Sequence, residues 1–230
     1  MRNGLLFFLG LFAALAFSWV GVVLWPNAQL GQLKPYVDEN EGKAFPERLS
    51  GLAAQGQHVY EDLGCAACHT QQVRRPDFGS DKARGWGDRQ SVARDYISQT
   101  RVQLGASRLG PDLANLAGRK PAYDAEDLAR LLYVGTPNHP SFRFLFTQRS
   151  LAGRQSADQA LDLHGAQAAP DGFEVVPTYR ARALVAYLLS LNNAYEYPEA
   201  QPIEPAAKEG EAKGATHLPA IPASTRPAPA

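Results

Sequence analysis

The stretch that decides the fold is residues 64–69, which read GCAACH. It contains the pattern Cys-x-x-Cys-His, the attachment signature of a c-type haem. Two thiols separated by two residues on one turn can reach the two vinyl groups along one edge of a porphyrin, and the next imidazole then lies under the iron. The sequence therefore predicts one covalent haem c, attached through Cys65 and Cys68 and ligated by His69.

Other uses of the two cysteines fit the sequence less well. The chain has only these two, and so short a loop is a poor structural disulfide. A zinc site would need a second pair of ligands, and a thioredoxin-like redox pair would need a βαβ context. Neither is found, which leaves a chance occurrence of the motif as the remaining alternative to haem.

A long apolar segment precedes the motif. Residues 5–25 read LLFFLGLFAALAFSWVGVVLW and carry no charge. As a helix they would rise about 31 Å, against a bilayer core of about 30 Å. Pro26 is expected to stop this helix. A cleaved signal peptide is the alternative, but the apolar run continues well past the cleavage-like residues 14–16. The sequence therefore favours an uncleaved anchor that contacts membrane lipid.

The charges near the anchor predict its orientation. Arg2 is the only basic residue before the apolar segment, which favours a cytoplasmic N-terminus. We therefore expect a single-pass protein of the cytoplasmic (inner) membrane whose remaining chain lies on the periplasmic side.

The composition divides the chain into four parts. We expect a transmembrane anchor at 1–26, a linker at 27–49, a mono-haem domain at 50–196 and a disordered tail at 197–230. The tail is rich in Pro and Ala and nearly lacks aromatic and β-branched residues, so it could not bury enough surface to offset the entropy of ordering.

Helical patterns dominate the haem domain. The expected helices span residues 50–63, 125–134 and 177–191, with Ser50 and Asp124 as candidate N-caps. No stretch shows convincing strand alternation. The sequence therefore predicts an all-α fold.

The residues around the motif resemble those of class I cytochromes c. The likeness includes Gly56 and Tyr60 before the motif, the run from 110 to 119 after it, and the final helix. The resemblance implies that the Pro111 carbonyl accepts a hydrogen bond from His69. It also implies that the last helix crosses the first, with Gly56 allowing close approach. An ordinary turn role for Pro111 stays open.

A closer resemblance, over roughly residues 1–195, is to the mono-haem membrane subunit of cbb3-type cytochrome c oxidases. It includes the anchor, the run Thr-Gln-Gln-Val-Arg at 70–74, and a long insertion before Gly110 that contains Gly-Trp-Gly at 85–87. The resemblance implies an electron-transfer subunit without a catalytic site of its own. Its expected partners are a catalytic membrane oxidase subunit and another cytochrome c.

The sixth iron ligand departs from the usual pattern. Class I cytochromes c generally use Met, but the chain has only Met1, on the wrong side of the anchor. His139 stands where related oxidase subunits have methionine. The sequence therefore predicts iron ligation by His69 and His139, and a lower potential than in Met-ligated relatives. His164 is the second choice, and an open sixth position is a further alternative.

Two questions stay open from the sequence. An alternative function is that of the small cytochrome subunit of a nitric oxide reductase, also an anchored mono-haem protein, and an open sixth site would suit a haem-based sensor. The formal net charge of zero argues against a nucleic-acid partner.

A local basic cluster is either a solvated loop face or a docking surface for an acidic partner. It comprises Arg74, Arg75, Lys82, Arg84, Arg89 and Arg94.

Overall fold

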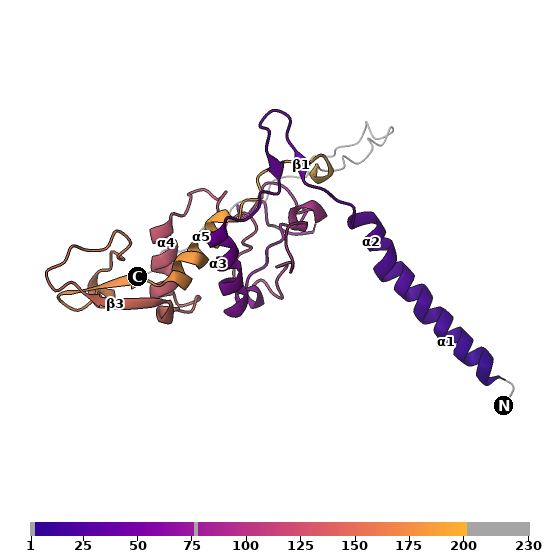
Figure 1. Ribbon diagram of the computed structural model, residues 1–230, viewed down its shortest axis with the longest axis horizontal. Helices are drawn as coiled ribbons and strands as arrows, with labels where there is room; N and C mark the ends of the chain where they lie inside the picture. The colour runs from indigo at the N-terminus through magenta and orange to yellow at the C-terminus, as the bar shows by residue number, and fades with distance from the viewer. Residues whose placement is uncertain (1–2, 76–77, 202–230) are drawn as a thin grey trace, which may run out of the picture.

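The computed structural model describes residues 3–75 and 78–201. A long N-terminal helix stands away from a domain in which α3 (Gly51–Asp62), α4 (Ala125–Val134) and α5 (Tyr179–Ser190) lie together (Figure 1). The remaining helical elements are α1 (Gly4–Trp19), η1 (Val20–Leu24), α2 (Trp25–Leu30), η2 (Cys65–Ala67), η3 (Ala93–Tyr96), η4 (Arg143–Leu145), η5 (Gly165–Gln167) and η6 (Pro198–Ala200), and the strands are β1 (Tyr36–Val37), β2 (Ala44–Phe45), β3 (Phe146–Ser150) and β4 (Phe173–Pro177).

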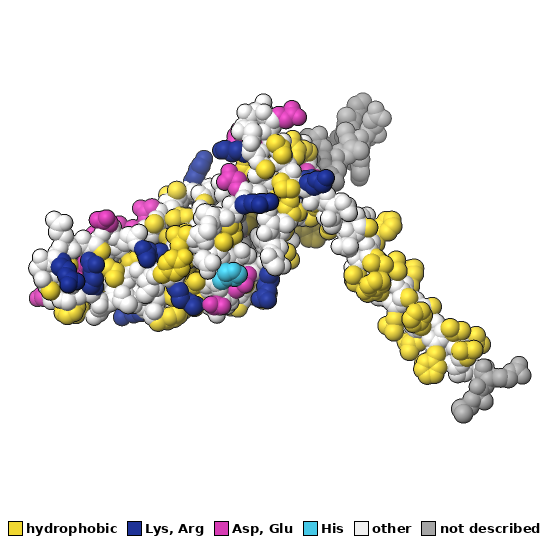
Figure 2. Space-filling view, viewed as in Figure 1, with side chains coloured by type: hydrophobic (Ala, Val, Ile, Leu, Met, Phe, Trp, Pro, Cys, Tyr) yellow, Lys and Arg dark blue, Asp and Glu magenta, His cyan; other side chains and the backbone are white. Residues whose placement is uncertain are grey.

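The N-terminal segment is long and apolar enough to cross a membrane. Elements α1, η1 and α2 form one continuous helix, Gly4–Leu30, of 27 residues. Figure 2 shows hydrophobic side chains along its length, and the domain does not bury them. The predicted membrane anchor is therefore present as a single exposed helix.

The prediction that Pro26 stops this helix is wrong. The helix continues through Pro26 to Leu30. Proline lacks an N–H and normally clashes with the carbonyl four residues earlier. Here the preceding turn, η1, is a wider π turn in which the Trp25 N–H bonds to the Val20 carbonyl. This wider turn accommodates the ring within the first turn of α2.

The centre of the domain is the crossing of α3 and α5. Ser50 Oγ accepts a hydrogen bond from Ala53 N at 3.3 Å and so caps α3 as expected. A Cβ on Gly56 would overlap the Ala183 carbonyl oxygen and lie 2.7 Å from Tyr187 Cβ. The two helix backbones can therefore meet only because residue 56 has no side chain.

Substitution of Gly56 by alanine is expected to destabilise the domain by about 3 kcal/mol, because the helices must separate to admit the methyl group. Urea unfolding of the holoprotein, followed by circular dichroism, measures this change. Gly51→Ala in the same helix is the matched control, because an added Cβ there meets nothing within 4 Å. Equal unfolding midpoints for the two variants would contradict the crossing.

The described part of the chain is not all-α, so this expectation is not confirmed. Strands β1 and β2 form one antiparallel pair, and β3 and β4 form another, with Phe146 opposite Pro177 and Ser150 opposite Phe173. Pro177 ends β4, and Thr178 caps α5, which therefore begins two residues later than predicted. Strands β1 and β2 have only two residues each, and the burial of residues along β3 and β4 does not alternate, so the strands give no clear alternating pattern.

The region predicted as a linker packs onto the domain. The rings of Phe45 and Tyr195 stack at 3.9 Å, and the Tyr195 hydroxyl donates to Asp38 Oδ2 at 3.0 Å. Tyr197, the first residue of the predicted tail, is only 1% exposed. The packed structure therefore continues past residue 196, and residues 202–230 of the predicted tail lie outside the described residues.

Two residues of the basic cluster hold this region together. Arg89 Nη2 lies 2.7 Å from Asp95 Oδ1, and the guanidinium lies 4.8 Å from the centroid of the Tyr197 ring. Arg94 pairs with Glu199 and also faces Tyr197. Because both arginines are committed to internal contacts, neither a solvated loop face nor a docking surface describes them.

Candidate functional site

The two cysteines and His69 lie on one tight turn after α3. Gly64 has a φ of +68°, which lets the chain leave the helix in the left-handed region. The next residues form the single turn η2, and His69 N donates to Cys65 O at 3.0 Å. Both thiols are free, with Cys68 the more exposed.

The environment of Cys65 differs from that of a redox-active thiol. Burial raises the pKa of the Cys65 thiol to about 11, with a smaller contribution from Cys68. Reactive redox cysteines have lowered pKa values, because the thiolate is the nucleophile. Its surroundings therefore do not favour the thiolate, which argues against a thioredoxin-like pair.

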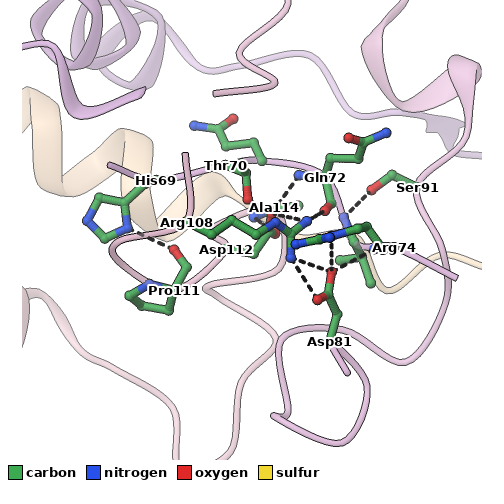
Figure 3. Close-up of polar contacts among 12 residues, drawn as sticks. His69, Thr70, Gln72, Arg74, Asp81, Ser91, Arg108, Pro111, Asp112 and Ala114 are labelled. Atoms are coloured by element: carbon green, nitrogen blue, oxygen red, sulfur yellow. Dashed lines mark hydrogen bonds and ion pairs between the residues drawn. The ribbon is translucent and has the colours of Figure 1, made fainter. Parts of the chain in front are cut away.

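The His69 ring is held by the loop that follows the insertion. Its Nδ1 donates to the Pro111 carbonyl at 2.8 Å (Figure 3). A carbonyl can only accept, so Nδ1 carries the proton and Nε2 keeps its lone pair free for a metal. This is the arrangement that the resemblance implied for Pro111.

Gly110 makes room for that ring. A Cβ on Gly110 would lie 2.6 Å from His69 Nδ1 and 2.9 Å from Nε2. The φ of Gly110 lies outside the left-handed region, so the requirement for glycine comes from the ring and not from the backbone. Sequence reasoning placed Gly110 in the loop but did not identify this role.

His139 projects from a rigid turn after α4. Thr136 N donates to His139 O at 2.9 Å, and His139 N donates to Thr136 O at 3.0 Å. Gly135 precedes this turn with a φ of +72°, and a Cβ there would lie 2.8 Å from His139 O. The short double-bonded turn therefore fixes the position of His139.

The His139 ring is partly buried beside His69. Its Nδ1 is buried and has no hydrogen-bond partner within residues 3–75 and 78–201. Burial lowers the pKa of His139, the nearby His69 lowers it further, and the Pro140 backbone acts against both. The lowered pKa favours the neutral ring, which is the form that binds a metal.

The structure brings the His69 and His139 rings close together, with their planes inclined by 50°. Their ring centroids are 6.1 Å apart. A metal–imidazole bond is about 2.0 Å long and a ring centroid lies about 1.1 Å behind its nitrogen, so two imidazoles on one ion have centroids about 6 Å apart. The observed separation thus fits one iron between the rings.

The other histidines considered lie elsewhere. The His164 side chain is 84% exposed and its Nε2 lies 3.3 Å from Asp162 Oδ2. The His58 side chain is also exposed and pairs with Glu61. His139 is therefore the predicted distal candidate that the structure brings to His69.

The surroundings of the pair also suit a planar apolar group. Phe142 lies against His139 with ring centroids 5.9 Å apart, and two apolar side chains are exposed, Phe144 two residues further on and Leu109 next to Gly110. An apolar ring could cover these exposed side chains.

The combination of a membrane-spanning helix with a helical domain that carries the Cys-x-x-Cys-His turn defines the class, which is that of membrane-anchored cytochromes. Residues 7–164 match the family model described as cytochrome c oxidase, mono-heme subunit/FixO, and the chain belongs to this family. This confirms the resemblance to the mono-haem subunit of cbb3-type oxidases. A comparison with curated proteins found no matching relative.

Proposed function

We propose that the haem of this oxidase subunit is a six-coordinate haem c, bound through Cys65 and Cys68 and ligated by His69 and His139. The chain belongs to a family of electron-transfer subunits with one haem. The observation that carries the finer assignment is the 6.1 Å separation between the ring centroids of His69 and His139. Haem c supplies a one-electron couple at this position.

Each residue has a distinct part in this arrangement. The thiols of Cys65 and Cys68 tether the group to the turn after α3. Pro111 fixes the tautomer and orientation of His69. His139 closes the sixth position, so that no substrate or gas enters, and it keeps the potential lower than methionine would.

The fold also supports a location and a set of partners. A single membrane helix would leave the described domain on one side of the membrane, and Arg2 favours the periplasmic side for it. The haem domain would accept electrons there from another cytochrome c or a quinol-derived donor. It would pass them to the catalytic membrane subunit of the oxidase.

The test uses the full-length protein, exported in a host that matures c-type cytochromes and purified in detergent. We expect one haem per chain that survives denaturation, and a ferrous spectrum that does not change when carbon monoxide is added. The double variant Cys65→Ser/Cys68→Ser, lacking both thiols, should lose the covalent haem. A colourless wild-type protein would overturn the attachment, and rapid carbon monoxide binding would favour a sensor with an open site.

A further inference from the structure

A network of buried charges lies directly behind the hydrogen bond between His69 and Pro111 (Figure 3). Its centre is Asp112, whose side chain is fully buried. A buried carboxylate is stable only when its charge is paired and its oxygens accept hydrogen bonds. The partners of Asp112 therefore show what the network holds in place.

Asp112 joins the two chain segments that carry His69 and Pro111. Its Oδ2 accepts from Thr70 Oγ1 at 2.5 Å and from Gln72 N at 2.7 Å, while its Oδ1 accepts from Ala114 N at 2.9 Å. Backbone bonds reinforce this link, since Leu113 N donates to Thr70 O at 2.7 Å. The carboxylate thus fixes the residue after the ligand to the residue after its hydrogen-bond acceptor.

Arg108 connects Asp112 to a second buried carboxylate. Arg108 Nη1 lies 2.7 Å and 2.6 Å from the two oxygens of Asp81, and Nη2 lies 3.6 Å from Asp112 Oδ2. Nη2 also donates to the Gln72 carbonyl. Asp81 is 2% exposed and also accepts from Arg74 N at 2.8 Å. The Arg108 guanidinium therefore pairs with two buried carboxylates that water cannot screen, and Arg74 Nε lies 4.0 Å from Asp81 Oδ2 as a further partner.

The network ties the insertion to the proximal ligand. Asp81 and Arg108 both belong to the insertion that precedes Gly110, whereas Asp112 belongs to the loop that holds His69. The Arg108 side chain is only 15% exposed and its guanidinium also faces the Trp86 ring at 5.7 Å. The long insertion therefore supplies fixed charges to the back of the haem site.

We infer that Arg108 and Asp112 are positioning residues that set the haem potential through His69, an inference that rests on the proposed function. A fixed negative charge in a poorly screened site favours ferric over ferrous iron, and a fixed positive charge does the opposite. Removing the charge of Asp112 therefore raises the potential, and removing that of Arg108 lowers it.

The experiment is a redox titration of the full-length holoprotein in detergent. At fixed applied potential, Asp112→Asn should raise the ratio of reduced to oxidised haem about fivefold, and Arg108→Gln should lower it about fivefold. A tenfold ratio corresponds to about 59 mV for one electron. Arg108→Lys keeps the charge and should stay near wild type, although it loses the second guanidinium nitrogen that donates to the Gln72 carbonyl.

The matched controls are exposed charges on the β1–β2 hairpin. Lys43→Gln and Glu41→Gln remove one charge of each sign from an exposed ion pair, and neither should change the ratio by more than about a factor of two. Asp81→Asn leaves the hydrogen bonds of Asp112 to residues 70, 72 and 114 intact. Asp81→Asn should therefore raise the ratio of reduced to oxidised haem less than Asp112→Asn does. It replaces Asp112→Asn in the test if the latter variant loses its haem.

The outcomes separate this inference from the proposed function. Opposite shifts in Asp112→Asn and Arg108→Gln, with a near-normal Arg108→Lys, support the inference. Shifts in the same direction, or shifts no larger than those of the hairpin controls, overturn it while the haem assignment stands. A wild-type protein without covalent haem overturns both.

Discussion

Replacement of His139 by alanine is expected to open the sixth iron position, so that the ferrous protein binds carbon monoxide completely where the wild type binds none. The reason is geometric, because His139 faces His69 at 6.1 Å from a turn fixed by two backbone hydrogen bonds. No neighbouring histidine can move in to replace it within the described chain, since His58 and His164 pair with carboxylates at the surface. Visible spectroscopy of the reduced holoprotein under carbon monoxide measures the change.

Replacement of His139 by methionine tests the same position without opening it. Methionine stabilises ferrous iron relative to a second histidine, so the potential should rise by on the order of 100 mV. The control for both variants is His164→Ala, whose exposed ring should be dispensable. If His164→Ala opens the site and His139→Ala does not, the distal ligand has been assigned to the wrong residue.

Local signals in the sequence predicted the parts of the molecule that depend on neighbouring residues. The attachment turn needs only residues 64–69, and the caps Ser50 and Asp124 bond to backbone three residues away. The helix expected at 125–134 is observed with these bounds. In each case the determining contacts lie within one helical turn of the residue, which is the range over which sequence patterns are informative.

Long-range contacts account for what the sequence did not reveal. Asp81 and Arg108 are 27 residues apart, and no local pattern indicates that they meet. The role of Gly110 depends on a ring 41 positions earlier in the chain, and Gly135 matters only because the chain returns at His139. The β3–β4 pair joins segments on either side of a long loop. The role of each of these residues can be recognised only in the folded structure.

The pairing of His69 with His139 was predictable only in part from the sequence. The absence of any methionine after the anchor excluded the usual ligand by composition alone. Choosing His139 over His164 needed the resemblance to a family in which a methionine stands at that position. The structure adds the 6.1 Å separation of the two rings, which neither composition nor spacing could supply.

Substitution of Gly110 by alanine is expected to displace His69 from the iron while leaving the haem attached. The added methyl carbon would lie 2.6 Å from Nδ1, far inside ordinary contact distance, and the ring can escape only by leaving the Pro111 carbonyl. The thioethers do not depend on this ring. The holoprotein should therefore still form, with a high-spin haem and a stability lower by about 3 kcal/mol.

The Gly110→Ala and His139→Ala variants should differ in which histidine remains bound to the iron. The iron–histidine stretching frequency of the ferrous five-coordinate haem, measured by resonance Raman, distinguishes a histidine held by a carbonyl from one that is not. His139→Ala should show the strongly hydrogen-bonded His69, whereas Gly110→Ala should show His139, whose Nδ1 has no such partner in the described structure. Gly51→Ala, which adds the same methyl group in open space, should keep a low-spin haem. A low-spin Gly110→Ala protein with wild-type stability would mean that His69 does not occupy the position beside Gly110 when the haem is bound.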